Sequence, residues 1–243
     1  MSVEFANWMS IHTQLSVSSV GKYAGAVLTI SKEMHSVGFI VKPLSDMSLI
    51  ELDVAISVIL AHPGFIRKNK KGNHMYSNSL KQYRYFRLDT SDEYEISLDP
   101  GLVLKDDDAH YLTQTEKETI MKARIGQGPY RKRLLEKYEK RCVVTGIDNA
   151  KLLVASHIKP WSVCDNQERI DGENGLLLSA NMDKLFDCGL ITFSHAGKLF
   201  VSSFVGKENE KRLHITDSII VKLRATPRLL EYLDYHQDVL FVK

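Results

Sequence analysis

An acid-rich break divides this chain into two parts whose apolar residues follow different periods. Between Asp89 and Asp108, eight acids stand against one base, and Pro100 and Gly101 interrupt any regular element. Before the break, apolar residues recur every three or four positions, which is the period of an amphipathic helix. After residue 141 they fall into short runs bounded by turn residues, which is typical of strands. The sequence therefore predicts an α+β protein, with a helical part first and a mixed part second.

The first part of the chain, residues 1–90, predicts a small helical domain. Helical spacing of apolar residues covers residues 20–34, 49–59 and 75–88. Ser16 is suited to cap the first of these helices, and Pro63 ends the second. We expect residues 91–114 to form an acidic linker.

The second part, residues 115–243, carries the mixed pattern. Tyr130, Leu134 and Tyr138 are spaced like one face of a helix that leads into it. Strands are expected over residues 152–156, 175–178, 190–193 and 198–201, and helices over residues 182–187 and 226–235. Two strands followed directly by a short helix thus form the centre of this part.

The net charge of +2 hides two strongly basic segments. Residues 65–87 hold seven bases and no acids, and residues 121–141 hold eight bases and two acids. Phosphate contacts from Lys and Arg dominate the affinity of DNA-binding proteins, so we expect these segments to bind double-stranded DNA. A solvated helix face is the simpler alternative for each segment. The candidate DNA contacts, which include one residue outside the segments, are Arg67, Lys68, Lys70, Lys71, Lys81, Arg84, Arg124, Gln127, Arg131, Lys132 and Lys159.

Cysteine use and hydropathy indicate a cytoplasmic protein. Cys142, Cys164 and Cys188 form no Cys-x-x-Cys pair and are too few for a disulfide framework, so we expect free thiols. The first residues do not resemble a signal peptide, and no apolar run reaches the length of about 18 residues that a membrane span needs. We expect no membrane partner.

Three short motifs in the second part of the chain contain the residues best suited to catalysis. They read Cys142-Val-Val-Thr-Gly, Ala155-Ser156-His157-Ile158-Lys159-Pro160-Trp161, and Glu173-Asn174-Gly175 continuing to Asp183. In order and spacing they closely resemble the HNH nuclease family, over residues 141–203. The resemblance implies a ββα-metal core, with a His at the end of one strand, an Asn at the start of the next, and a metal ligand on the helix that follows.

Taken residue by residue, the resemblance implies a role for each polar residue of the motifs. His157 matches the general base, and Asn174 matches the residue that organises the loop between the strands. Asp183 stands where the family places a metal ligand on the helix. A neutral imidazole can deprotonate water near neutral pH, and carboxylate oxygen suits Mg²⁺ or Mn²⁺. We therefore expect metal-dependent hydrolysis of phosphodiester bonds.

The sequence departs from the family pattern in two places. Many members have an Asp directly before the catalytic His, whereas this chain has Ser156, a weaker metal ligand; Asn181 is a further candidate. Many members also bind a structural zinc through two Cys-x-x-Cys pairs. The matching positions here are Cys142, Thr145, Ser179 and Met182. A structural zinc usually needs four nitrogen or sulfur ligands, so we expect none, with apolar packing in its place.

Together these features predict an HNH endonuclease that restricts foreign duplex DNA. The segment from Arg124 to Arg131 resembles the lead-in of a subset of the family found among restriction endonucleases. One ββα-metal site cuts one strand per encounter, so cleavage of both strands implies a homodimer. Three alternatives stay open: an enzyme that acts on methylated or hydroxymethylated cytosine, a DNA-binding protein with an inactive core, and a nuclease that acts on RNA.

Overall fold

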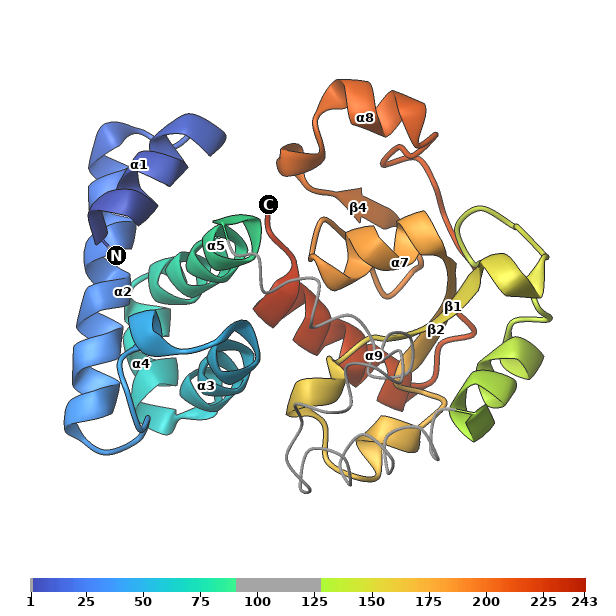
Figure 1. The fold of residues 1–243 in the computed structure, drawn as a ribbon, viewed down its shortest axis with the longest axis horizontal. Coiled ribbons are helices and arrows are strands. Elements are labelled where there is room, and N and C mark those ends of the chain that lie inside the picture. Colours follow the sequence, from blue (N-terminus) through green and yellow to red (C-terminus); the bar gives the residue numbers. More distant parts are fainter. Residues whose placement is uncertain (1, 91–127) are drawn as a thin grey trace, which may run out of the picture.

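The computed structural model describes residues 2–90 and 128–243 (Figure 1). The acidic linker and the candidate DNA contacts Arg124 and Gln127 lie outside the described residues. The described chain is helical first and contains both helices and strands afterwards, which confirms the predicted α+β class.

The N-terminal region consists of helices whose bounds follow from their capping residues. They are α1 (Ser2–His12), α2 (Val17–Ser36), α3 (Leu49–Ala61), α4 (Pro63–Lys71) and α5 (Met75–Thr90). Ser16 caps α2, and Ser48 forms a capping box with Glu51 at the start of α3. Pro63, which has no N–H to donate, is the first residue of α4. Of these helices, α2, α3 and α5 lie where the apolar spacing predicts them, whereas α1 and α4 have no counterpart among the expected helices.

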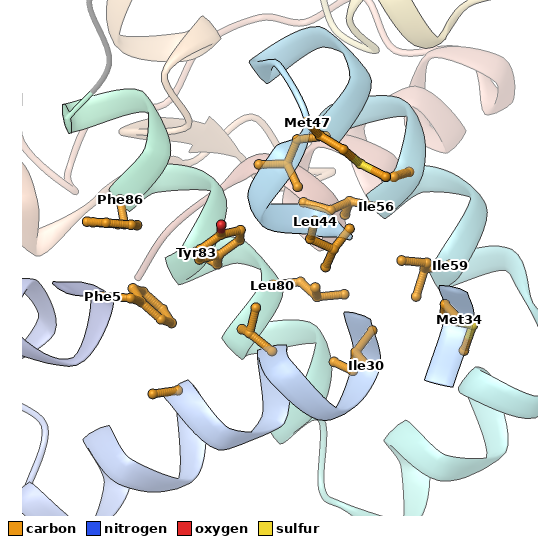
Figure 2. Packing of buried hydrophobic residues seen from close by; sticks show 14 of the residues in the cluster. Phe5, Ile30, Met34, Leu44, Met47, Ile56, Ile59, Leu80, Tyr83 and Phe86 are labelled. Atoms are coloured by element: carbon orange, nitrogen blue, oxygen red, sulfur yellow. The ribbon is translucent and has the colours of Figure 1, made fainter. Parts of the chain in front are cut away.

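The core of this helical region lies between α2, α3 and α5 (Figure 2). Ile30, Ile56 and Leu80 are completely buried there. The rings of Phe5 and Tyr83 meet edge to face, with their centroids 5.3 Å apart. Because α5 packs against α1, α2, α3 and α4, it buries polar as well as apolar side chains, among them Ser79, Leu80 and Arg84.

A hairpin and a helix form the centre of the second region. β1 (Leu153–His157) pairs antiparallel with β2 (Gly175–Ser179), so that Leu153 lies opposite Ser179 and His157 lies opposite Gly175. α7 (Ala180–Asp187) begins directly after β2 and packs against both strands. This is the ββα arrangement that the sequence predicts.

Shorter elements surround this centre. They are a helix over residues 128–137, β3 (Ile191–Phe193), β4 (Leu199–Val201), α8 (Lys207–Arg212) and α9 (Pro227–Tyr235). β3 and β4 form a second antiparallel hairpin, close to the predicted strand positions. The helix predicted over residues 226–235 is α9, while α8 has no counterpart in the prediction.

The last residues of the chain join the two regions. A π-helical turn, His236–Leu240, follows α9 and places Val239 and Leu240 in the apolar cluster of the helical region. Val242 N donates to Gly189 O, just after α7, at 3.0 Å. In Figure 1, α9 and this C-terminal segment are red and lie between the blue-to-green helices and α7. The segment that sequence assigns to the nuclease part therefore also completes the core of the helical part.

No single helix within residues 2–90 and 128–243 is long and apolar enough to cross a membrane. α3 and α4 together reach that length and composition, but they meet at a bend of 78°.

Candidate active site

The two site residues His157 and Asn174 meet at one end of the β1–β2 hairpin. His157 is the last residue of β1, and Asn174 directly precedes Gly175, the residue that pairs with His157. Residues 158–174 form the loop between the strands, and Ile158 N donates to Asn174 O at 3.2 Å. Strand pairing therefore brings both ends of this loop beside the imidazole.

The imidazole of His157 is held by a backbone carbonyl and by an aromatic ring. Its Nε2 lies 3.0 Å from Arg169 O. A carbonyl oxygen only accepts hydrogen bonds, so Nε2 carries the hydrogen and the neutral ring has its basic lone pair on Nδ1. One face of the ring stacks on Tyr130, with centroids 4.2 Å apart and an interplanar angle of 8°. The side chain is half-buried, so the structure presents an imidazole that two contacts orient and that is partly accessible to solvent.

The side chain of Asn174 ties together distant parts of the loop. It is completely buried. Its Oδ1 accepts from Lys159 N at 2.8 Å, and its Nδ2 lies 3.2 Å from Glu168 O and 3.2 Å from Cys164 Sγ. These bonds fix the loop on both sides, including Glu168, the neighbour of the Arg169 carbonyl that holds His157. An amide fits this place because it offers an acceptor and two donors on one short side chain.

An ion pair closes the same loop. Lys159 Nζ lies 2.6 Å from Glu168 Oε2, and both side chains are largely buried. The guanidinium of Arg169 lies over the ring of Trp161, 3.9 Å from its centroid, so this tryptophan anchors the loop. Burial raises the pKa of Cys164 to about 12, so its thiol stays protonated at neutral pH. The loop that carries Arg169 O is thus fixed at several points.

Ser156 and Asp183 are the oxygen donors that fit a metal ion. Ser156 is 3% exposed, and its Oγ is buried without a hydrogen-bond partner. Asp183 is half-buried on α7, the helix that packs against β1. A hydroxyl and a carboxylate suit a hard cation such as Mg²⁺, which uses few protein ligands and retains several waters. Among the described residues, no three or more His, Cys, Asp or Glu side chains are grouped so that they could hold a metal ion.

The third predicted metal ligand, Asn181, lies elsewhere on α7. It is exposed near the start of the helix. It stands two positions before Asp183, which corresponds to about 200° around a helix. The structure therefore does not bring Asn181 to the side of α7 that carries Asp183.

Of the four positions matched to zinc ligands, Cys142, Thr145 and Ser179 form a hydrogen-bonded cluster. Cys142 Sγ accepts from Thr145 N at 3.3 Å and from Ser179 N at 3.2 Å. Burial raises the pKa of Cys142, but these hydrogen bonds outweigh burial and the pKa is lowered overall. Met182 is buried beside the cluster in the apolar core. The donor set is one thiol, two hydroxyls and a thioether. A structural zinc is usually held by Cys thiolates and His nitrogens, and the prediction that no structural zinc binds depends on this difference.

The structure removes two candidate DNA contacts from the surface. Arg84 is 7% exposed, and its Nε and Nη2 donate to the carboxylate of Asp53 at 2.6 and 3.0 Å. Lys81 Nζ donates to Gln237 O at 2.8 Å, and burial lowers the pKa of Lys81 to about 8. Both cations are thus bonded within the protein because α5 is the central helix of its region, so the structure does not favour these two residues as DNA contacts.

The other described candidates divide into paired and exposed cations. Lys68 pairs with Glu33, Arg131 donates to Leu153 O and Ala150 O, and Lys159 pairs with Glu168. These three side chains hold parts of the protein together. The exposed candidates are Arg67, Lys70, Lys71 and Lys132.

Comparison with known families decides what this region is. Residues 142–194 match the family described as HNH endonuclease. This segment is therefore similar to HNH endonucleases. It includes His157, Asn174 and Asp183, whereas the helical region and the helix that carries Tyr130 lie outside the match. No curated protein matches the chain.

The sequence does not indicate every residue that shapes the candidate site. Arg169 contributes its backbone carbonyl, which no side-chain motif can reveal. Tyr130 is predicted as a helix-face residue, and its contact with His157 joins positions 27 apart in the chain. Helical spacing indicates that Tyr130 is buried, but gives no sign of what it is buried against.

Proposed function

We propose that this chain is a metal-dependent DNA endonuclease in which His157 activates the attacking water. The observation that carries this proposal is the hydrogen bond between His157 Nε2 and Arg169 O. That bond selects the tautomer whose Nδ1 can accept a proton. A positioned general base contributes about 10²- to 10⁴-fold to the rate of such a reaction.

The proposed chemical step is a hydrolysis with a simple proton balance. His157 Nδ1 takes a proton from water as the water oxygen forms its bond to phosphorus, and the bond from phosphorus to the 3′ oxygen breaks. The 3′ oxygen takes a proton from solvent water, and the imidazolium later returns its proton to solvent. The imidazolium that forms keeps its Nε2 hydrogen bond to the Arg169 carbonyl, which favours the charged ring. Asn174 acts as a positioning residue because it holds the loop that supplies this carbonyl.

Ser156 and Asp183 are the residues we propose to hold the divalent ion. When bound, that ion would neutralise charge that develops on the phosphate and stabilise the leaving oxygen. Ser156 stands where many relatives have a carboxylate, so Asp183 is the anionic ligand we expect to dominate the affinity for Mg²⁺ or Mn²⁺.

The exposed cations of α4 are the part of the helical region best placed to bind duplex DNA. Arg67, Lys70 and Lys71 lie in a segment without acids, and their side chains are exposed. We propose that they bind phosphates, while foreign duplex DNA is the substrate and two copies of the chain cut the two strands. The alternative substrate is DNA that contains modified cytosine, and the plasmid assay described next distinguishes the two substrates.

Digestion of plasmid DNA tests the activity. Methylated and unmethylated plasmids are incubated with the protein and Mg²⁺ or Mn²⁺, and the ends are sequenced. We expect cuts that depend on the metal. Cleavage of methylated plasmid alone would identify a modification-dependent enzyme and contradict restriction of unmodified foreign DNA. Cleavage of RNA but not DNA would overturn the proposed substrate. Binding without any cut would identify an inactive core.

Substitution of Asp183 tests the metal site. Asp183→Ala should weaken Mn²⁺ binding and cleavage together, while Glu208→Ala, an exposed acid on α8, should change neither. Calorimetric titration with Mn²⁺ measures binding apart from cleavage. Undiminished metal affinity in Asp183→Ala would remove this residue from the site.

The salt dependence of DNA binding tests the α4 surface. Replacing Arg67, Lys70 and Lys71 by Ala should reduce the slope of log affinity against log salt by about 0.9 for each phosphate that the variant no longer neutralises. The matched control replaces Lys207, Lys211 and Arg212 on α8, which makes the same change in charge. Equal slopes for the two triple variants would show that α4 is not the DNA-binding surface.

A further inference from the structure

Tyr130 lies outside the segment that matches the HNH family, yet it touches the core of the proposed site. It belongs to the helix over residues 128–137 and is 2% exposed. The family match begins at residue 142. Contacts of Tyr130 with His157 therefore extend the site into a part of the chain that the match does not cover.

The ring of Tyr130 supports one face of the His157 imidazole. The two rings are nearly parallel, with an interplanar angle of 8° and centroids 4.2 Å apart. The hydrogen bond to Arg169 O holds Nε2, but a hydrogen bond at one nitrogen does not by itself fix the tilt of the ring plane. Contact with a flat aromatic face restricts this tilt. Together, the two contacts determine the direction in which Nδ1 points.

The hydroxyl group of Tyr130 fixes the supporting ring in turn. It donates to Asn174 O at 2.9 Å, and Ser156 O lies 3.3 Å away as a second acceptor. Burial raises the pKa of Tyr130 well above its ordinary value, so the hydroxyl keeps its proton. A side chain at Gly175 would overlap this hydroxyl, so the strand residue opposite His157 leaves room for Tyr130. The tyrosine thus contacts β1 and the residue that directly precedes β2.

We propose that Tyr130 is a positioning residue for His157, which holds the imidazole plane in the orientation needed for proton transfer. The inference rests on the proposed function of His157 as the general base. A misplacement of about 1 Å in a catalytic group can lower a rate about 100-fold. Loss of the ring should therefore act on the rate of cleavage rather than on DNA binding.

Tyr138 provides a matched control. It is also a buried tyrosine. At the rise of an α-helix, its position in the sequence is about 12 Å beyond Tyr130 along the helix axis. Its hydroxyl is bonded to the backbone as well, at 3.1 Å from Leu223 O and 3.3 Å from Gly175 O. Replacing either tyrosine removes a buried ring and a hydroxyl donor beside the hairpin, but only Tyr130 stacks its ring on His157 in the described contacts.

Kinetics of four variants test the proposal. Tyr130→Leu should lower kcat by about 10- to 100-fold with little change in KM, whereas Tyr130→Phe, which keeps the ring, should stay within a few-fold of the unsubstituted protein. Tyr138→Leu and Tyr138→Phe should lower thermal stability but leave kcat within a few-fold when measured on folded protein. Unchanged kcat in Tyr130→Leu, or an equal loss in Tyr138→Leu, would overturn the proposal. If Tyr130→Leu does not fold, Tyr130→Met takes its place, because it keeps a long apolar side chain without a ring.

An NMR measurement tests the same contact without cleavage. The carbon-bound ring protons of His157, assigned by their loss in His157→Gln, should be shifted upfield by the tyrosine ring at a fixed alkaline pH without metal. They should move downfield in Tyr130→Leu or Tyr130→Met but not in Tyr138→Leu. An unshifted His157 signal in the unsubstituted protein would contradict the positioning role even if cleavage occurs. If the protein never cleaves but the signal is shifted, the proposed function fails while the contact stands.

Discussion

Two histidines in different regions of the molecule are held in the same way but differ in their access to solvent. His157 bonds through Nε2 to Arg169 O at 3.0 Å and stacks on Tyr130. His236, in the C-terminal segment, lies 3.0 Å from Phe186 O through its own Nε2 and stacks on Phe186, with centroids 3.8 Å apart. A carbonyl and an aromatic face thus orient both imidazoles.

The difference lies in burial and in the surroundings of the ring. His236 is completely buried, and its Nδ1 lies 3.0 Å from Thr192 Oγ1, which donates to it. Burial lowers the pKa of His236 to about 3; the bond to Phe186 O opposes this shift, and the nearby cations Arg84 and Lys81 add smaller decreases. His157 is only half-buried. An oriented imidazole is therefore a structural part of the fold where solvent is excluded, and a candidate base where solvent has access.

Asn174→Ala should have the largest effect on kcat among substitutions around His157, apart from substitution of the histidine itself. The change releases the loop on both sides and leaves Lys159 N without its acceptor. We expect kcat to fall by about 100-fold, because the Arg169 carbonyl moves with the loop, and the free energy of unfolding to fall by about 2 to 3 kcal/mol. Single-turnover cleavage and urea denaturation measure the two effects.

Asn209→Ala on α8 is the control for this substitution. Asn209 Nδ2 donates to Val205 O at 3.0 Å, so the control also removes a side-chain hydrogen bond to the backbone. It should leave kcat unchanged. A fall in stability without a fall in kcat for Asn174→Ala would show that the loop does not position His157.

The pH dependence of stability should reveal the buried state of His236. Its folded pKa, about 3, lies below its unfolded value near 6.5, so the unfolded chain binds the proton first as the pH falls. The stability due to neutral His236 is present above about pH 6.5 and is lost on acidification toward about pH 3. Between about pH 7 and about pH 5 the loss should be about 2 kcal/mol.

Comparison with His236→Gln isolates this contribution from other titrating groups. Glutamine offers a donor and an acceptor but does not titrate. The variant should lose less stability than the unsubstituted protein over the same pH range, measured by urea denaturation at each pH. Parallel pH profiles would contradict a depressed pKa for His236.

A smaller effect is expected at the second nitrogen of His236. Thr192→Val keeps the shape of the side chain but removes the hydroxyl that donates to Nδ1. The free energy of unfolding should fall by about 1 to 2 kcal/mol, while kcat stays unchanged. Loss of cleavage in this variant at full folding would show that the C-terminal segment takes part in the chemistry, and the contrast between the two histidines would then be wrong.

The sequence predicts the hairpin, α7 and their order because the strands are short apolar runs and the motifs have fixed spacing. It does not predict α1, whose buried residues Phe5, Trp8 and Met9 become a core only against α2 and α5. The sequence does not predict α4 because its one buried residue, Phe65, is followed mainly by charged residues, so no apolar period is visible. In both cases, the partner that buries the face is distant in the chain.

The same limit applies to charged and polar side chains. Arg84 has the appearance of a surface cation in sequence, but its partner Asp53 lies 31 positions away and the pair is buried. Lys81 bonds to Gln237, which is 156 positions away. The role proposed for His157 comes from its motif, whereas its contacts with Tyr130 and Arg169 O depend on tertiary packing. Local sequence therefore identifies which groups can react, and the fold determines which of them are oriented.

Single-turnover cleavage of duplex DNA by His157→Ala and His236→Ala tests the central claim most directly. Both variants are compared with the unsubstituted protein at saturating DNA and Mg²⁺ or Mn²⁺, with binding measured separately and rates corrected for the folded fraction. We predict that His157→Ala binds DNA normally but cleaves at least about 100-fold more slowly, while folded His236→Ala cleaves at the normal rate. Full cleavage by His157→Ala would contradict the assignment of His157 as the general base.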